Sequence, residues 1–299
     1  MTYIPETADM ADTVPLRILV PLDGTPRSQQ ALPYAQSLAM SPATIILLEV
    51  LPDPEPERGL RGNITLPAEV VGQRQAAAAT DALEKVAARI RQETPAAGVE
   101  VAVIAGGSAD QILRVARARR TDLIVIATYS RSPVSRLVLG SVTDQVVRAA
   151  DTPVLVVRPQ DAAAPARVSR LVVPLDGSPT ATAALRLAVR LARQAALPVH
   201  LVTVADPRHD DAKYRMKRHY KTLAEFGLSV SAATLVGEPA RAIEETTRPD
   251  DLIVMASHHR AGVKAWLLHG VAERLISHGR CPVLITPPMA NVTVSTQPD

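Results

Sequence analysis

Short apolar runs alternate with longer amphipathic segments along the chain. In the first half, runs rich in Val, Ile and Leu occupy residues 17–22, 44–50, 99–105, 123–128 and 153–158. Turn-forming residues bound each run, which is typical of parallel strands that are buried on both faces. The segments between them, at 25–39, 68–93, 108–119 and 140–150, have the spacing of helices. This β-α alternation predicts a doubly wound α/β fold, a parallel sheet with helices on both faces.

The same plan restarts after a linker rich in Ala and Pro. RLVVPLDG at residues 170–177 repeats RILVPLDG at 17–24, an offset of 153 (170 − 17). DLIVMA at 251–256 repeats DLIVIA at 122–127, an offset of 129 (251 − 122), because the second copy is shorter between its second and third strands. The chain is therefore an internal duplication. We predict a flexible N-terminal arm at 1–15, a first domain at 16–159, a linker at 160–168, a second domain at 169–288 and a disordered tail at 289–299.

Composition limits the choice of partners. Hydrophobic residues make up 47% of the 299 residues but aromatic residues only 2%, so the cores must be built from Val, Leu, Ile and Ala. The net charge of +3 is too weak to indicate a nucleic-acid surface, and so few aromatic residues give no stacking platform. The basic segment 114–120 has the spacing of a solvated helix face. We therefore expect no nucleic-acid partner.

The cysteine count and the distribution of apolar residues indicate a cytoplasmic protein without membrane contact. The single Cys281 excludes an internal disulfide and fits a reducing compartment. Residues 1–15 contain acidic side chains and no apolar core, so they do not have the pattern of a signal peptide. No apolar run reaches the length that spans a membrane.

The candidate chemistry lies in residues 122–141. A buried strand at 123–128 leads into a loop that delivers Gly140 and Ser141 to the start of a helix. Free backbone N–H groups and the positive end of a helix dipole are the two ingredients of a phosphate site. If the first and fourth strands are neighbours, Asp23 faces this loop across the crevice where ligands bind in open parallel sheets. Asp23 then either accepts from an adenine amino group or a ribose hydroxyl, or only forms a turn with Gly24.

The sequence gives weaker support for a metal site or for a catalytic site. The histidines at 258, 259, 269 and 278 suggest a metal, but no known metal-binding motif is present and we expect no metal site. A P-loop, G-x-G-x-x-G and G-x-S-x-G are all missing from the sequence. Because we find no general base and no phosphate-binding lysine motif, we expect this chain not to be an enzyme, or at most to hydrolyse a bound ligand very slowly.

Each half resembles a universal stress protein domain. The motifs that carry the resemblance are LVPLDG at 19–24, VVPLDG at 172–177, the two DLIV strands, GSVTDQVV at 140–147, PVLVV at 153–157 and PVLI at 282–285. The resemblance implies a tandem two-domain member that acts in the stress response. It also implies an adenine-nucleotide alpha-hydrolase-like fold, with five parallel strands per domain in the order 3-2-1-4-5, and binding of ATP, with Mg²⁺, or of a related adenine nucleotide.

The nucleotide-binding members of that family carry G-x2-G-x9-G-[ST] after the fourth strand. The first half matches only its last pair, since its residues are Ala127, Ser130, Gly140 and Ser141, and the second half matches no position. Glycine lets a backbone approach phosphate closely, so we expect a usable first site, assisted by the charge of Arg131, and a degenerate second site. The first site comprises Pro21, Asp23, Val50, Ala127, Ser130, Arg131, Gly140, Ser141 and Val142. The degenerate second site comprises Asp176, Val204, Ala256, His259 and Gly270.

Two alternatives to a nucleotide-binding protein remain open. One is a nucleotide-independent signalling module that acts through dimerisation and partner binding. The other, an enzyme of a related nucleotide fold, lacks the S-G-G-x-D-S signature. In either case the apolar closing strands, 153–158 and 282–286, would be sheet edges that soluble proteins usually cover. Since universal stress proteins use this strand for dimer contacts, the resemblance implies that the two closing strands pair with each other as an internal pseudo-dimer, and a further homodimer stays open.

Overall fold

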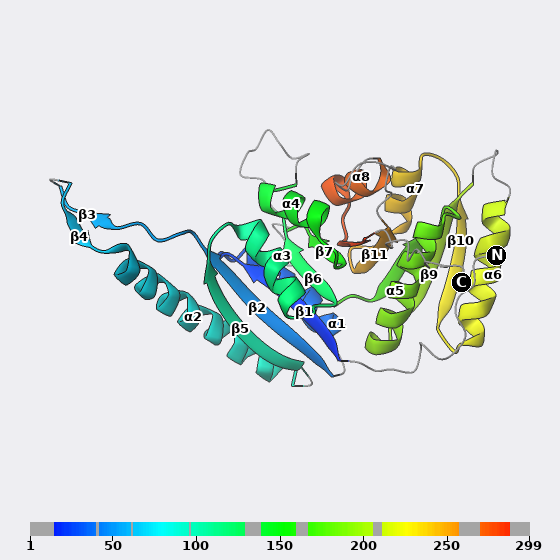
Figure 1. The fold of residues 1–299 in the computed structure, drawn as a ribbon. Coiled ribbons are helices and arrows are strands. Elements are labelled where there is room, and N and C mark those ends of the chain that lie inside the picture. Colours follow the sequence, from blue (N-terminus) through cyan, green and yellow to red (C-terminus); the bar gives the residue numbers. More distant parts are fainter. Residues whose placement is uncertain are drawn as a thin grey trace, which may run out of the picture.

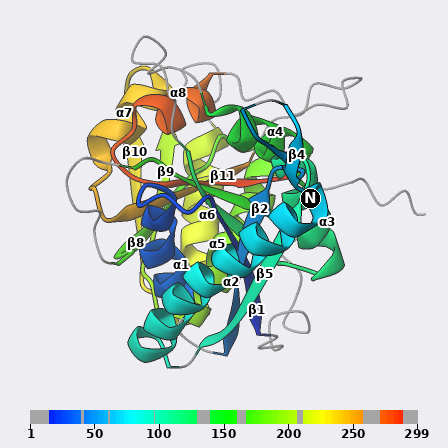
Figure 2. The ribbon, with the colours of Figure 1, turned by 90° about the vertical axis from the view of Figure 1, so that its left-hand side faces the viewer.

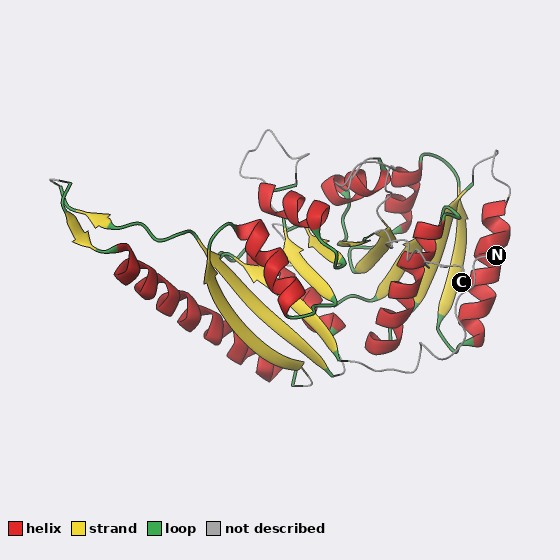
Figure 3. Ribbon diagram, in the orientation of Figure 1, coloured by secondary structure: helices red, strands yellow, loops and turns green. Residues whose placement is uncertain are grey.

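The computed structural model describes residues 15–39, 42–60, 62–95, 97–128, 139–159, 167–205, 211–256 and 270–287. Ten strands form one sheet, in the order β10-β9-β8-β11-β12-β7-β6-β1-β2-β5 (Figures 1 and 3). The strands of the first half are β1 (Leu16–Leu22), β2 (Ala43–Leu51), β5 (Ala97–Ala105), β6 (Leu123–Ala127) and β7 (Val154–Val157). Those of the second half are β8 (Arg170–Pro174), β9 (Val199–Val204), β10 (Val230–Leu235), β11 (Asp251–Ala256) and β12 (Val283–Thr286).

Each half is a parallel sheet with the strand order 3-2-1-4-5, which confirms the predicted fold class. One face carries a 3-10 turn, η2 (Ser28–Ala31), and the helices α1 (Leu32–Leu38), α2 (Ala68–Glu93), α5 (Pro179–Ala195) and α6 (Asp211–Glu225). The other face carries α3 (Ser108–Ala118), α4 (Ser141–Ala149), α7 (Pro239–Thr246) and α8 (Val271–His278). On each face one cluster of buried apolar side chains continues through both halves. In the part of the chain that the structure describes, no helix is both long and apolar enough to cross a membrane.

The two halves meet through their closing strands. β7 and β12 pair antiparallel, with Leu155 opposite Leu284, and both strands are fully buried. This confirms the predicted pairing of 153–158 with 282–286 and leaves β5 and β10 as the outer edges of the sheet. The Arg158 guanidinium adds a hydrogen bond to the backbone carbonyl of Ser277.

Equivalent aspartates of the two repeats hold different partners. Asp251 is fully buried and accepts three hydrogen bonds from its own half, at 3.0 Å from Arg170 Nε, 2.6 Å from Arg170 Nη2 and 2.8 Å from the Arg248 backbone N–H. Asp122 accepts the backbone N–H of Arg17 at 2.9 Å and forms a 2.7 Å ion pair with Arg190 of the other half. The aspartate at this position therefore stabilises the second half internally when it is Asp251, whereas Asp122 of the first half helps to join the two halves.

The tight turns after the first strands have the same geometry in both repeats. Gly24 and Gly177 follow β1 and β8 with φ of +74° and +82°, a backbone region that favours glycine. Thr25 then accepts the Ser28 N–H at 3.3 Å, and Ser178 accepts the Ala181 N–H at 3.1 Å. These hydroxyls satisfy backbone donors at the start of η2 and α5.

One segment differs from its sequence prediction. Residues 52–67, which their Pro, Glu, Arg and Gly content predicts to be a loop, contain a small hairpin of β3 (Glu57–Arg58) and β4 (Ile64–Leu66). A turn closed by the Gly62 N–H on the Gly59 carbonyl, at 2.8 Å, joins the two strands. The hairpin and the first turns of α2 extend away from the sheet (Figures 1 and 2).

Stability should fall as the pH drops below about 6.5, and His200 should account for part of the fall. Its side chain is 9% exposed and its Nδ1 lies 2.7 Å from Ser231 Oγ. Burial lowers the pKa of His200 below its usual 6.5, and the nearby Arg170 cation lowers it further. The unfolded chain therefore binds a proton more readily, so protonation favours unfolding as pH falls through 6.5 toward the lower folded pKa. Urea unfolding at pH 7.5, 6.5 and 5.5 should show a smaller decrease in the free energy of unfolding for His200→Asn than for the wild type. Equal decreases in the two proteins would contradict this role of His200.

Candidate functional site

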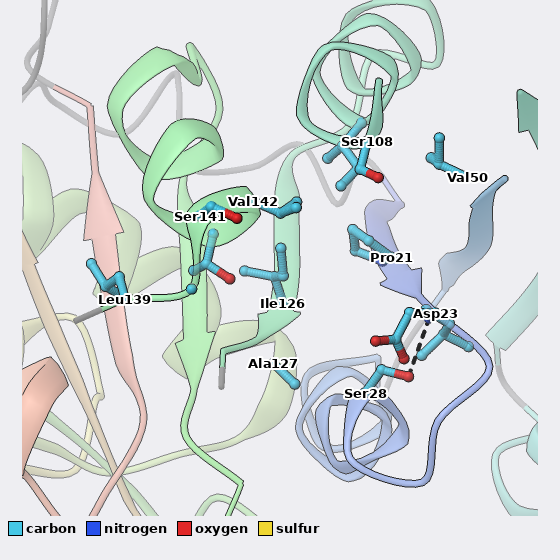
Figure 4. A pocket seen from close by; sticks show the side chains of 14 residues that line it. Pro21, Asp23, Ser28, Val50, Ser108, Ile126, Ala127, Leu139, Ser141 and Val142 are labelled. Carbon is cyan, nitrogen blue, oxygen red and sulfur yellow. Dashed lines mark hydrogen bonds between the residues drawn. The ribbon is translucent and has the colours of Figure 1, made fainter. Parts of the chain in front are cut away.

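A cavity of about 500 Å³ opens at the carboxyl ends of β1, β2 and β6 (Figure 4). Strand order reverses between β1 and β6, so the helices that follow them lie on opposite faces and leave a crevice there. Seven of the nine predicted first-site residues line this cavity. They are Pro21, Asp23, Val50, Ala127, Gly140, Ser141 and Val142. The other two, Ser130 and Arg131, lie outside the described residues.

Two helix N-termini border the cavity. α4 begins at Ser141 and α3 begins at Ser108, and neither helix has a side-chain cap, since glycines stand at both N-cap positions. The first N–H groups of a helix have no carbonyl partner inside it, and they carry the positive end of its dipole. Ser108 on α3 and Ser141 and Val142 on α4 all line the cavity, so this side attracts anions.

The start of α4 is held in place by a hydrogen bond that sequence reasoning missed. The Gly140 N–H donates to Thr128 Oγ1 at 3.1 Å, and the Thr128 side chain is 7% exposed. Gly140 has φ −54° and ψ 146°, a conformation open to any residue. Any advantage of glycine at this position therefore comes from close approach of a ligand and not from the backbone angle.

The opposite side of the cavity is acidic. Asp23 Oδ1 accepts the Thr25 N–H at 3.0 Å and the Thr25 hydroxyl at 2.6 Å, so Asp23 does form the turn that was one of its two interpretations. Its own N–H donates to Ser28 Oγ at 3.3 Å (Figure 4). Asp23 is exposed and lines the cavity, so its carboxylate also lies where a ligand would contact it.

Glu49 lies close to Asp23 but is not one of the residues that line the cavity. Burial raises the pKa of the Glu49 carboxyl above its usual range, and the negative charge of Asp23 raises it further. Asp23 therefore supplies the carboxylate of the cavity wall. A cavity with helix N-termini on one side and a carboxylate on the other suits a ligand with phosphate at one end and hydrogen-bond donors at the other.

Seven further residues line the cavity, and all of them except Thr143, which opens the predicted phosphate-binding helix with Val142, escaped sequence reasoning. They are Leu22, Ser28, Ser108, Ile112, Ile126, Leu139 and Thr143. Leu22, Ile126 and Leu139 adjoin predicted site residues in the chain, and that adjacency could have indicated them. Ser28, Ser108 and Ile112 reach the cavity only through packing of η2 and α3 on the sheet, for which the sequence carries no local signal.

The second half places its candidate residues at corresponding points of its own strands and helix. Asp176 follows β8, Val204 and Ala256 end β9 and β11, and Gly270 precedes α8. His259 lies outside the described residues. Gly270 has φ +82° and ψ −121°, which contrasts with the ordinary extended geometry of Gly140. The two helix starts therefore present their backbones differently. Among the described residues of both halves, no three His, Cys, Asp or Glu side chains are grouped as metal ligands.

The chain is similar to known proteins in both sequence and fold. The model of the Universal stress protein family matches residues 16–158 and 168–287. Universal stress protein MJ0531 of Methanocaldococcus jannaschii is 28% identical over 136 residues, which are 39% of this chain and 80% of that protein. Universal stress protein Rv2005c of Mycobacterium tuberculosis is 27% identical over 180 residues, 55% of this chain and 61% of that protein. The crystal structure of a universal stress protein from Archaeoglobus fulgidus superposes with a TM-score of 0.69 at 21% identity, covering 91% of this chain and 98% of that one.

The hydrogen bond between Thr128 and Gly140 should protect the Gly140 amide from exchange. Replacing Thr128 by Val removes the acceptor, and loss of such a bond costs about 1–1.5 kcal/mol, or about tenfold in the opening equilibrium. Amide exchange followed by NMR should be faster by about that factor at Gly140 in Thr128→Val. Thr128→Ser keeps the hydroxyl and serves as the matched control, in which protection should persist. Equal exchange rates in wild type and Thr128→Val would show that this bond does not hold the start of α4.

Proposed function

The chain belongs to the universal stress protein family, and we propose that its first half binds ATP or a related adenine nucleotide in the cavity beside α4. The observation that carries this proposal is the meeting of seven predicted residues in one cavity, with helix N-termini on one side and the Asp23 carboxylate on the other. We place the two functional units at residues 16–159 and 169–288 of a cytoplasmic, stress-responsive protein.

The phosphates would lie at the N-terminus of α4. The free backbone N–H groups at this helix start can bind phosphate without help from a lysine side chain, and Ser141 adds a hydroxyl at the same place. In this proposal Mg²⁺ enters with the triphosphate, and Arg131 contributes charge from the segment after β6. The role of Gly140 is to let the phosphate approach the backbone closely.

The adenosine would lie toward β1 and β2. Pro21 and Val50 supply apolar surface for the base, and both line the cavity. Asp23 would accept from a ribose hydroxyl or from the adenine amino group through the carboxylate that it presents at the cavity wall. The second half, with His259 and the altered geometry at Gly270, would act as a degenerate copy that does not share this ligand.

A protein that binds without fast turnover fits this site better than an enzyme. The carboxylate nearest the cavity, Asp23, is already engaged with Thr25, and it lies on the side opposite the proposed phosphates. We therefore propose occupancy of the cavity as the output, with hydrolysis very slow at most.

A nucleotide-independent interaction module is the second candidate. The observation that favours it is that the site satisfies its own polar groups, since Thr25 engages Asp23 and Thr128 engages Gly140. In that case the crevice would be a closed structural element, and partner binding or homodimerisation would be the output.

Calorimetric titration of ATP with Mg²⁺ should distinguish the two candidates. We expect one site per chain in the wild type and at least about tenfold weaker binding in Gly140→Asp, because a carboxylate at the start of α4 repels phosphate and occupies its place. Aspartate is a favourable N-cap residue, so this variant should unfold at the same temperature or a higher one. Loss of binding would then not reflect loss of fold.

Gly140→Ala is the matched control. Its backbone geometry is accessible to alanine and it adds no charge, so ATP affinity should fall less than in Gly140→Asp. Absence of ATP binding by the wild type would retire the nucleotide proposal in favour of the interaction module. Equal affinity in wild type and Gly140→Asp would place any bound nucleotide elsewhere.

A further inference from the structure

The segment that joins β2 to α2 leaves the body of the molecule and has internal contacts of its own. We call residues 52–69 the projecting segment, which contains the hairpin and the first two residues of α2. The Gly59 N–H donates to the Asn63 carbonyl at 2.9 Å across its turn. The start of the segment packs on α2, because a Cβ atom on Gly72 would lie only 3.0 Å from Pro54 Cγ. These contacts give the projecting segment a defined shape outside the sheet (Figures 1 and 2).

The projecting segment exposes two large apolar side chains together with acidic ones. Leu60 is fully exposed and Ile64 is 56% exposed. A two-stranded hairpin is at best marginally stable in water, and it gains stability when an apolar face is covered. Four exposed acids accompany these side chains, against two arginines. The acids are Asp53, Glu55, Glu57 and Glu69, and the arginines are Arg58 and Arg61.

The helix α6, at the other end of the sheet, has the opposite charge. Its sequence, DAKYRMKRHYKTLAE, contains five Lys or Arg residues and two acids. Tyr214, Arg218 and Lys221 are exposed and stand four and three residues apart, so they share one side of the helix. Met216 and Leu223, on the other side, are buried. The outward side of α6 thus presents cations around a tyrosine that is 75% exposed.

Large exposed apolar side chains gather at the two outer edges of the sheet. Among the described residues they are Leu60 and Ile64 at one end, and Tyr214, Tyr220, Phe226 and Val236 at the other. α2 packs on β5 and α6 packs on β10, and these are the outer strands. A sheet of ten strands separates its outer strands by about 40 Å. The projecting segment also points away from α6, so the two ends do not meet within one molecule (Figure 1).

We infer that the projecting segment binds α6 of a second copy of this chain. In this contact the acidic side chains of the segment face the cations of α6, and its apolar side chains cover the ring of Tyr214. Opposite charges on the two surfaces speed the encounter and determine which surfaces pair. Because every copy has both surfaces, a two-fold axis lets two copies form the contact twice, which gives a closed dimer.

A second copy accounts for both ends at once. A basic partner would cover the projecting segment and leave α6 exposed, and an acidic partner would do the reverse. The closing strands β7 and β12 are already paired with each other inside the chain, so they are not open to another molecule. The two ends complement each other in both charge and apolar character, and a second copy supplies the complement of each.

Sedimentation velocity and light scattering of the full-length protein at about 1–100 µM test the contact. Wild type should dimerise in about 50 mM salt with a Kd of about 1–50 µM, and about 500 mM salt should raise that Kd at least about fivefold. Glu55→Lys with Glu57→Lys should weaken dimerisation at least about tenfold, and so should Lys217→Glu with Lys221→Glu. A protein with all four changes exchanges the charges across the contact and should dimerise like wild type. Leu60→Ser should raise the Kd about tenfold, because an apolar side chain is no longer buried in the contact.

Arg114→Glu with Arg117→Glu is the matched control. These exposed arginines lie on α3, on the opposite face of the sheet from α6, and the change in net charge equals that of the α6 variant. One cation of each pair has an acidic neighbour, since Arg117 lies 2.9 Å from Asp151 and Lys221 lies 3.9 Å from Glu225. The control should dimerise like wild type.

Four outcomes would overturn the inference. The first is a wild type that stays monomeric up to about 100 µM. The second is a dimer that survives both charge reversals, because its contact would then lie elsewhere. The third is a folded protein with all four changes that does not dimerise, and the fourth is an equal loss in the α3 control, which would mean that only net charge matters. All substituted side chains are exposed, and thermal unfolding should confirm that each variant folds.

Discussion

The antiparallel pairing of β7 with β12 is the contact on which the rest of the structure depends. Each strand would otherwise be an apolar sheet edge, and unpaired edges of that kind lead to association between molecules. Pairing fuses two five-stranded sheets and lets one apolar cluster continue through both halves on each face. Because the strands are parallel within each half and antiparallel at the junction, the strands of the two halves point in opposite directions. The loops that follow their carboxyl ends are thereby kept apart and can diverge independently.

Divergence of the repeats is visible in how shared positions are used. Asp251 holds Arg170 within the second half, whereas Asp122 reaches across the junction to Arg190. The start of α4 has ordinary extended geometry at Gly140, whereas the start of α8 has a positive φ at Gly270. The two repeats thus share one fold, while groups at corresponding places in it make different contacts.

The cavity illustrates how polar groups can be satisfied before a ligand arrives. Asp23 is held by Thr25, and the Gly140 amide is held by Thr128, so the walls of the site are ordered by their own hydrogen bonds. Such preorganisation lowers the entropy cost of binding, because the contacting groups are already fixed. It also lets the crevice stay folded when empty, which both functional interpretations of this chain require.

Much of the fold followed from local sequence pattern. Buried parallel strands need unbroken apolar runs, and the tight turns after them favour Asp-Gly, so the strands and the duplication were readable in the sequence. The seven cavity residues were predicted only in part from this pattern, because positions such as Val50 and Ala127 came from the resemblance to universal stress proteins. The hairpin at 57–66, the Thr128–Gly140 bond and the entry of Ser28, Ser108 and Ile112 into the cavity were not readable. These features depend on which residues, distant in the chain, are brought together and on where their side chains point.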